Sequence, residues 1–469
     1  MDEPAEDAPA AYRDRSAAQR TKVLLILSPG PEDHSARTLF GRLNARRLCA
    51  LMRVPTTETP GIWMIALLAA IGASVASQGA TRSTSFLGLD DVSLYIAPHS
   101  DRVANEPELQ AQLLSGPHEY FRFINGTFSR ALCQALRGEL ASMPRVSLHG
   151  DAHLEQYAVT DAGRGLTDFD DTATGPAVID LVRFGVSTQL ATREHRWPTD
   201  SRQIFRIFLD GYRDGLEGPE QELPEPTAAK RMLAEFDPDP EAFFAWAESL
   251  MAPIDDETRS ELEKGLGDYA AQLGTDDPSL PARFFEVVHM GSINLGIGSA
   301  LDEKYLVRLR GPSDDPLDDI VVEAKEDRRR ERIECVTAGP KADPFRILVG
   351  QVLIPYRSYL GHFQMAGKPF WVHAWIAGYK ELDIRESVRT PAELAEIAYE
   401  SGVQLARAHF DGRTLEASAA DRARQEAIVT SHGKHFENVV SEMTDLTLAA
   451  WRRFRAVHAR AELSSTARP

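Results

Sequence analysis

Two acidic stretches in the middle of the chain carry residue types that could catalyse phosphoryl transfer. The first is HGDAHLEQ at residues 149–156, and the second is LTDFDD at residues 166–171. Strand-forming residues and a turn lie between them, which predicts a hairpin that brings Asp151 and Asp168 to one cleft. This pair suits phosphoryl transfer, because one carboxylate can orient or deprotonate an acceptor hydroxyl while the other holds magnesium against nucleotide phosphates.

A second signal lies more than a hundred residues downstream. The segment GIGS at 296–299 precedes a predicted strand at 305–309, and a second predicted strand over 320–325 ends in a lysine. Glycines let a backbone approach phosphates and present N–H donors, and a lysine on a neighbouring strand neutralises their charge. An ordinary turn and a solvated lysine are the alternative interpretation. The candidate phosphate contacts are Gly296, Gly298, Ser299 and Lys325.

The first stretch resembles the catalytic core of the aminoglycoside phosphotransferase and choline kinase branch of the protein-kinase-like superfamily. On that resemblance Asp151 is the catalytic aspartate, His149 beside it braces the catalytic loop, and Asp168 is the magnesium ligand. Gln156 stands where that branch has an Asn ligand to a second metal, and Asp170 is a further candidate ligand. The resemblance implies ATP and Mg²⁺ as cofactors and the hydroxyl of a small molecule as acceptor.

A longer region resembles a bacterial family known as domain of unknown function 2252. The resemblance rests on residues 149–181 and on 121–127, where this chain has Asn125-Gly126 in place of the Arg-Gly usual in that family. It covers about 117–460. In this setting Asp180 resembles the kinase aspartate that braces the catalytic loop from a helix.

The order of the motifs is unusual for a kinase, because the aspartates precede the glycine-rich segment. After that segment come Lys325, a strand at 370–374 where a hinge would lie, and a helix that Thr390-Pro391 begins with a capping box. We therefore predict an α+β, two-lobed, protein-kinase-like fold and hypothesise that it is circularly permuted. The hypothesis predicts that Lys325 lies across a cleft from Asp168. Glu331 and Glu334 are equal candidates for a glutamate that pairs with Lys325.

Shifts in composition and proline- or glycine-rich breaks suggest five regions. They are a disordered tail (1–20), an N-terminal extension without an assigned role (21–116), a mostly helical catalytic-loop lobe with an acidic helical insert (117–284), a β-rich nucleotide-binding lobe (285–385), and C-terminal helices that pack on the catalytic lobe (386–469). The helix after Thr390 has an apolar stripe at helical spacing, formed by Leu394, Ile397, Ser401, Leu405 and Ala408. A final helix is predicted over about 434–460.

The charge balance limits the partners. The chain has 469 residues, and its 70 acidic and 52 basic side chains give a net charge of −18, which disfavours nucleic acid and anionic lipid. The three cysteines have no metal-ligand spacing, and we interpret them as structural thiols of a cytoplasmic protein. The uncharged segment 59–81 predicts a buried or peripheral helix, with a membrane span as the alternative. Nothing in the sequence indicates the acceptor or the oligomeric state.

Two other functions fit parts of the same pattern. In a metal-dependent hydrolase, His149, Asp151, His153 and Asp168 would form a centre that activates water. In a nucleotide-binding pseudokinase scaffold, the departures at Gln156 and Asn125 would accompany a loss of transfer.

Overall fold

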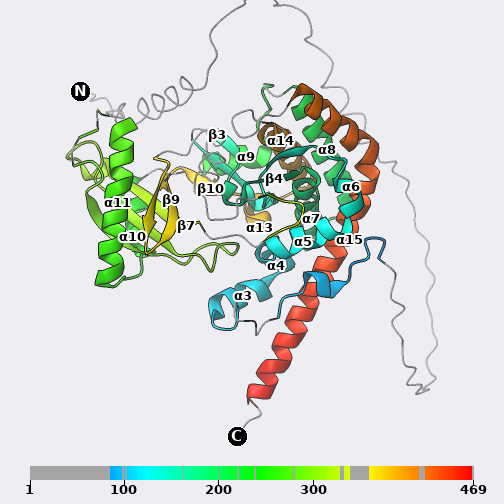
Figure 1. Ribbon diagram of the computed structural model, residues 1–469, viewed down its shortest axis with the longest axis horizontal. Coiled ribbons are helices and arrows are strands. Elements are labelled where there is room, and N and C mark those ends of the chain that lie inside the picture. Colours follow the sequence, from blue (N-terminus) through cyan, green and yellow to red (C-terminus); the bar gives the residue numbers. More distant parts are fainter. Residues whose placement is uncertain are drawn as a thin grey trace, which may run out of the picture. The chain divides into compact units, whose positions relative to one another are not determined.

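The computed structural model describes most of the chain from Ser85 onward (Figure 1). The described residues are 85–97, 100, 103–161, 163–198, 200–218, 221–236, 239–276, 278, 280–281, 283–327, 332–337, 359–410 and 418–466. The predicted tail 1–20, the segment 59–81 and Glu331 lie outside them. The part of the extension that is described holds the short helices η1 (Asp91–Leu94) and α3 (Pro107–Ser115).

Short strands and turns in the first half of the described chain hold the two acidic stretches. Strands β1 (Arg145–Leu148) and β4 (Ala173–Pro176) pair antiparallel, and a three-stranded sheet has the order β10-β2-β3, formed by Tyr379–Glu381, Tyr157–Thr160 and Gly163–Leu166. Tyr157 pairs with Leu166, which confirms the predicted hairpin. The helices that precede and interrupt these strands are α4 (Pro117–Phe123), α5 (Asn125–Ala135), α6 (Arg137–Leu140), η2 (Leu154–Gln156) and η3 (Phe169–Asp171).

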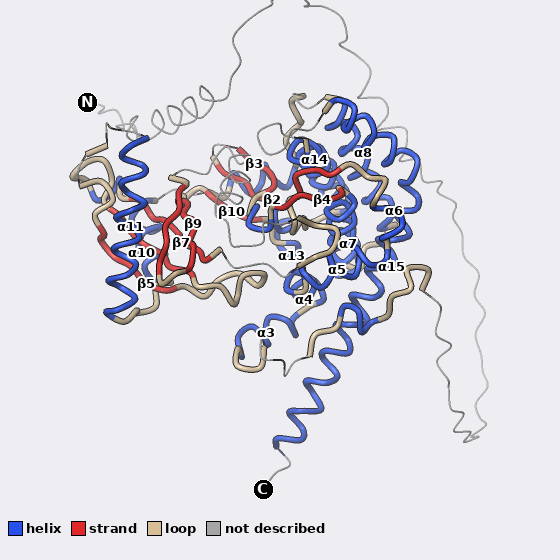
Figure 2. The backbone as a smooth tube through the Cα atoms, viewed as in Figure 1, coloured by secondary structure: helices blue, strands red, loops and turns tan. Residues whose placement is uncertain are grey.

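Four long helices enclose the largest hydrophobic core of the described residues. They are α7 (Val178–Glu194), α8 (Ser201–Glu217), α14 (Pro391–His409) and α15 (Ala419–Thr466), with the short helices α9 (Thr227–Ala234) and α13 (Ile384–Ser387). Figure 2 shows α7, α8 and α14 side by side. Helices α8 and α14 can approach closely because two glycines at their contact have no side chain. A Cβ on Gly211 would lie 2.1 Å from the Tyr399 carbonyl oxygen, and a Cβ on Gly402 would lie 2.2 Å from the Phe208 carbonyl oxygen.

The predicted C-terminal helices are present, with one longer than expected. Thr390 caps α14 by accepting a hydrogen bond from the Glu393 N–H at 3.2 Å. All five residues of its predicted apolar stripe are buried. Helix α15 begins at Ala419, well before the predicted start at 434.

A five-stranded antiparallel sheet forms the second core. Its order is β5-β6-β7-β9-β8, formed by Val287–Ser292, Lys304–Leu309, Ile320–Glu326, Lys368–Trp375 and Gly361–Met365. Alternate residues of β6 and β7 face opposite sides. Val307 and Val322 pack in one cluster with α11 (Asp256–Asp276), whereas Leu306 and Val321 pack in another with α10 (Pro240–Ser249). The acidic insert thus covers both faces of this sheet.

These elements establish an α+β fold. All described residues belong to one compact unit, which includes both the five-stranded sheet and the helices. The two lobes, their boundaries and the kinase-like permutation stay predictions. Among the helices of the described ranges, none combines the length and the apolar character that a bilayer crossing requires.

Candidate active site

A buried aspartate fixes the backbone of the loop that carries Asp151. The Asp180 carboxylate, on α7, accepts hydrogen bonds from the His149 N–H at 2.7 Å and the Gly150 N–H at 3.0 Å. His409, at the end of α14, lies 3.0 Å from Asp180 and also bonds to the Tyr212 hydroxyl at 2.8 Å. Asp180 therefore makes the loop contacts expected of the bracing aspartate, and His409 is a core residue.

His149 braces the loop and does not face the open space beside it. Its Nε2 lies 2.8 Å from the Thr167 carbonyl oxygen, and its Nδ1 accepts from the Asp151 N–H at 3.3 Å. The ring is fully buried, and its centroid lies 4.4 Å from that of Phe169. Since backbone groups occupy both ring nitrogens, His149 links the loop to the residue before Asp168. These are the contacts of a loop-bracing residue, which is the role that the kinase interpretation gives His149.

The second acidic stretch turns sharply beside this loop. Asp168 has φ 57°, in the left-handed region, and its side chain is 41% exposed. Gly150 has φ 84°, and a Cβ there would lie 1.9 Å from the Asp171 carbonyl oxygen, so only glycine fits. Asn125 on α5 donates from its amide nitrogen to the Gly150 carbonyl oxygen at 3.0 Å and to the Asp171 carboxylate. The two stretches are thus held together at the backbone.

Lys325 reaches these aspartates from the five-stranded sheet. Its Nζ lies 3.8 Å from Asp168 Oδ1 and forms a close ion pair with Asp170. Burial lowers the pKa of Lys325, but the two carboxylates outweigh burial and leave its pKa raised. Burial and the neighbouring Asp168 raise the pKa of Asp170 to about 7, although Lys325 opposes them. The predicted proximity of Lys325 to Asp168 is confirmed.

The glycine-rich segment forms a turn between β5 and β6. Gly296 has φ 82°, and a Cβ on Gly298 would lie 3.8 Å from Asp151 Oδ2. Sequence reasoning missed Lys304, the cross-strand partner of Lys325, whose Nζ donates to the Leu295 carbonyl oxygen and lies 3.3 Å from Ser299 Oγ. Burial and the charge of Lys325 lower the pKa of Lys304 to about 8. The turn is therefore held by a buried amine on one side and faces Asp151 on the other.

A cavity of about 920 Å³ is lined both by the two acidic stretches and by the glycine-rich turn with Lys325. The sequence-predicted residues that line it are Asp151, Gln156, Asp168, Asp170, Gly296, Gly298, Ser299 and Lys325. His149 does not line it. Gln156 donates from its amide nitrogen to Asp168 Oδ2 at 3.4 Å, so its amide would have to be reversed to coordinate a second metal. Glu334, a candidate partner of Lys325, lies at the rim, is 64% exposed and pairs with Arg137.

An arginine that the sequence did not single out pairs with Asp151. Arg183 on α7 is fully buried, and its Nε donates to Asp151 Oδ1 at 2.6 Å. Arg183 lies three residues after Asp180, so the two share one face of the helix beneath the loop. That spacing is a signal in the sequence, but spacing alone does not show burial.

A second charged network includes two residues that line the cavity, Arg122 and His153. Arg122 on α4 donates to Glu155 at 2.8 Å, and His118 lies 3.5 Å from the same carboxylate. Burial raises the pKa of Glu155, but His118 and Arg122 outweigh burial and lower it to about 2. His153, two positions after Asp151 in the same loop, is also buried, and burial together with the charge of Arg122 holds its pKa well below the usual value.

A disulfide closes one wall of the cavity. Cys133 on α5 bonds to Cys335, with their Cα atoms 5.7 Å apart, so the interpretation of these two residues as free structural thiols is wrong. The segment 332–337 that contains Cys335 lines the cavity, and Thr337 pairs with Thr174 of β4 through two backbone hydrogen bonds of 2.8 and 3.1 Å. A covalent link and a short ladder thus join this segment to the helical region.

The hydrolase interpretation lacks a ligand set in the part of the chain that the structure describes. Within those residues, no three His, Cys, Asp or Glu side chains are arranged to hold a metal ion by themselves. Hydrogen bonds to backbone groups use both nitrogens of His149.

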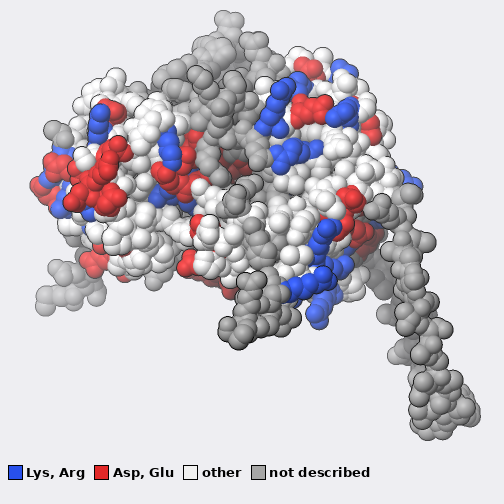
Figure 3. Space-filling view, turned by 60° about the horizontal axis from the view of Figure 1, so that its bottom comes forward, with Lys and Arg blue, Asp and Glu red and all other residues white. Residues whose placement is uncertain are grey.

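On the face seen in Figure 3, basic and acidic side chains lie beside one another, as expected from ion pairs among described surface residues.

Comparison with known proteins gives a family and no function. No curated protein and no solved structure matches the chain. A model of the family described as uncharacterized proteins conserved in bacteria (DUF2252) matches residues 107–232 and 220–457, which together make up more than half of the sequence. The chain belongs to this DUF2252 family.

Proposed function

We propose that the protein is an ATP-dependent phosphotransferase that acts on a hydroxyl of a small molecule. The observation that carries this proposal is the convergence of Lys325 and Asp168, 3.8 Å apart although 157 positions separate them in the chain. The same cavity contains Asp151 and the glycine-rich turn. A cation, a partly exposed carboxylate, a second carboxylate and free backbone N–H groups are what phosphoryl transfer from a nucleotide requires. The motif order makes a circularly permuted kinase-like arrangement the matching proposal for the fold.

The donor set fits magnesium as Mg·ATP. Mg²⁺ binds through one or two carboxylates and the substrate phosphates, and keeps several waters. Asp168 would be its main protein ligand because its carboxylate is 41% exposed, whereas Asp170 is engaged by Lys325. When bound, the ion neutralises charge that develops on the transferred phosphoryl group.

The remaining groups have separate tasks. Lys325 and the backbone of the turn at 296–299 would hold the phosphates. Asp151 would accept the proton of the acceptor hydroxyl as its oxygen attacks the γ-phosphorus. The bond from that phosphorus to the β–γ bridging oxygen then breaks, and ADP leaves with the electron pair.

Calorimetric binding of Mg·ATP and the release of ADP test this proposal. Candidate sugars and amino alcohols serve as acceptors. Asp168→Ala should lose magnesium-dependent nucleotide binding, whereas Asp151→Ala should keep binding and lose transfer. Asp161→Ala removes an exposed carboxylate at the hairpin turn and should change neither property. If the wild type binds no purine triphosphate with or without magnesium, the proposal is wrong.

A nucleotide-binding scaffold without transfer is the second candidate. The orientation of Gln156, whose amide nitrogen faces Asp168, favours it because an amide nitrogen cannot ligate a second metal. Binding without ADP release in the presence of every acceptor would support the scaffold over the transferase.

A further inference from the structure

We infer that Arg183 is a positioning residue for phosphoryl transfer, which fixes the Asp151 carboxylate so that one oxygen is presented to the acceptor. This inference rests on the proposed function and adds a residue that neither the motifs nor the family resemblance indicated. Both Nε and Nη2 of Arg183 contact the same oxygen, Oδ1 of Asp151. Neither contact involves the other oxygen, Oδ2, and Asp151 is one of the residues that line the cavity.

The second oxygen of Asp151, Oδ2, lies close to the glycine-rich turn. A Cβ on Gly298 would lie 3.8 Å from Oδ2, which places this oxygen beneath the glycine-rich turn. Nε2 of His153 lies 3.7 Å from Oδ2, beyond hydrogen-bond distance. The hydrogen bond to Arg183 therefore selects which oxygen of Asp151 faces the space where an acceptor hydroxyl and a γ-phosphate would meet.

Arg183 is itself held in one orientation. Its Cζ lies 4.3 Å from the centre of the Phe121 ring and 5.5 Å from that of Phe128. Nη2 also donates to the Phe121 carbonyl oxygen at 3.4 Å. Asp151 is the carboxylate to which it bonds among the described residues, and Nη1 has no hydrogen-bond partner there. The two rings lie 5.3 Å apart and so contact Arg183 from the same side. A planar guanidinium held against aromatic rings can orient a carboxylate more sharply than a flexible ammonium.

The pair also affects the protonation of Asp151. Burial raises the pKa of Asp151 and Asp168 adds to this, whereas Arg183 and His149 lower it. The other charged or titratable side chains around it are Arg122 from α4 and His153 from its own loop. Loss of the guanidinium would therefore favour the protonated acid, which cannot accept the hydroxyl proton.

Arg183→Lys tests the inference, because it keeps the charge and removes the fork. Arg308→Lys is the matched control: Arg308 also lies 4.3 Å from a phenylalanine ring, that of Phe244, but outside the cavity. The assay is phosphate release from Mg·ATP with water as the acceptor, together with the Kd of Mg·ADP. For Arg183→Lys we expect kcat to fall about 10–100-fold and KM for ATP to change less than about threefold. The acid limb of kcat should move to higher pH, because the hydrogen bond from the fork lowers the pKa of Asp151 in addition to the charge that lysine keeps. Arg308→Lys should leave all of these unchanged.

Other outcomes separate this inference from the proposed function. If the wild type binds no nucleotide, both are wrong. If the wild type turns over and Arg183→Lys keeps its kcat and pH profile while losing only thermal stability, Arg183 is structural and this inference alone is wrong. Binding without turnover by the wild type also overturns it, because no transfer step remains. Should Arg183→Lys fail to fold, Phe121→Leu removes the ring beneath the guanidinium, and an unchanged kcat in that variant would contradict the inference.

Discussion

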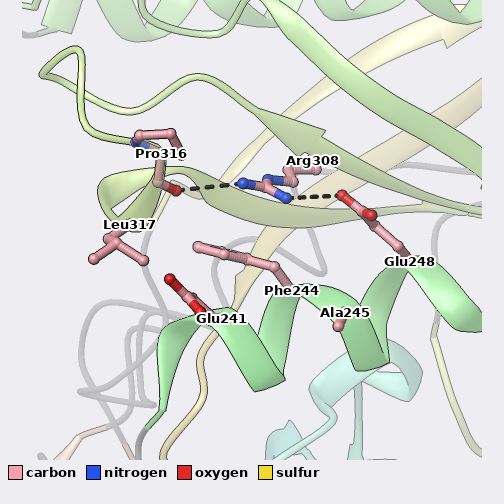
Figure 4. Close-up of a pocket in the computed structure, with 7 residues that line it drawn as sticks. All are labelled: Glu241, Phe244, Ala245, Glu248, Arg308, Pro316 and Leu317. Carbon is pink, nitrogen blue, oxygen red and sulfur yellow. Dashed lines mark hydrogen bonds and ion pairs between the residues drawn. The ribbon is translucent and has the colours of Figure 1, made fainter.

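Two arginines in this molecule lie at the same distance from a phenylalanine ring but in different surroundings. Arg183 and Arg308 each have Cζ 4.3 Å from the centre of a phenylalanine ring. Arg308 lies at a hollow of about 200 Å³ between α10 and the turn at η4 (Pro316–Asp318), where it contacts Glu248 at 2.9 Å and the Pro316 carbonyl oxygen at 3.4 Å (Figure 4). It also bonds to the buried Asp319 at 2.8 Å.

The difference lies in how many groups share each charge. Arg308 is partly exposed and bonds to several acceptors. These bonds connect strand β6 to α10 through Glu248 and to the turn at η4 through the Pro316 carbonyl oxygen. Arg183 is fully buried, bonds to one carboxylate, and that carboxylate borders the large cavity. The first arrangement stabilises the packing of a helix on a sheet. The second concentrates its effect on one oxygen, which is what a site for chemistry requires.

A disulfide connects α5 to the segment 332–337 that lines the large cavity, and its removal should have the largest effect on the free energy of unfolding. The Cys133–Cys335 disulfide closes a loop with a sequence separation of 202. In the chain-entropy model a loop of this size contributes about 5 kcal/mol to the free energy of unfolding. We expect the Cys133→Ser, Cys335→Ser double variant to lose up to about this amount in urea titrations without reductant. With a dithiol reductant present, wild type and variant should unfold alike; an unchanged difference would mean that the bond does not form in solution.

Removal of the two arginines compares the regions directly. Arg183→Met leaves Asp151 buried without its cation, and we expect a loss of about 3–5 kcal/mol in the free energy of unfolding. Arg308→Met should cost less, about 1–2 kcal/mol, because Asp319 keeps Arg310 at 3.6 Å. Equilibrium urea unfolding measures both. Adding Asp151→Asn to Arg183→Met should recover much of the loss, and equal costs for the two single variants would contradict the comparison.

Two carboxylates, Glu155 near the large cavity and Glu248 at the hollow beside Arg308, should differ in how much they contribute to the free energy of unfolding and in how that contribution changes at acid pH. The pKa of Glu155 is lowered from 4.5 to about 2 in the folded state, so its stabilising contribution is fully present above pH 4.5 and is lost as the pH falls through about 2. The size of that contribution is up to about 3 kcal/mol. Glu155→Gln should therefore destabilise the protein at pH 7, and the difference from wild type should narrow below pH 4.5.

Glu248→Gln supplies the control for this acid series. Its side chain is 34% exposed, and the loss of such an ion pair should cost less than about 1 kcal/mol at pH 7. A difference between wild type and Glu155→Gln that stays constant down to pH 3 would show that Glu155 does not act through its charge.

The parts of the site that sequence predicted are those set by local geometry. The hairpin between the acidic stretches has short loops and alternating strands, so the approach of Asp168 to Asp151 follows from the turn. Asp180 was assigned through a resemblance, and the structure gives it the expected bonds to the loop N–H groups. The residue pattern over 320–325 predicts the strand that carries Lys325, which the structure extends to Glu326, and the motif order predicts the approach of Lys325 to Asp168.

The rest depends on long-range packing that no spacing encodes. The sequence allows His149 either to brace the loop, as in the kinase interpretation, or to bind metal, as in the hydrolase interpretation. The ring lies inside the protein because two backbone groups bond to its nitrogens. No motif in the sequence marks Arg183, and its burial against Asp151 is what points to its role. The Cys133–Cys335 bond requires two distant segments to meet, and three scattered cysteines do not specify which pair will do so.

The smallest expected effect lies where the glycine-rich turn faces Asp151. A Cβ on Gly298 would lie 3.8 Å from Asp151 Oδ2, an ordinary contact, so Gly298→Ala should change the free energy of unfolding by less than about 0.5 kcal/mol. The added methyl takes space between the turn and the carboxylate, and we expect it to weaken Mg·ATP binding about fivefold in calorimetry. Gly296→Ala is the matched variant, and its positive φ of 82° should cost about 1 kcal/mol of stability. If Gly298→Ala keeps the wild-type affinity, the turn does not contact the nucleotide, and the large cavity loses the feature that most distinguishes it from the hollow at Arg308.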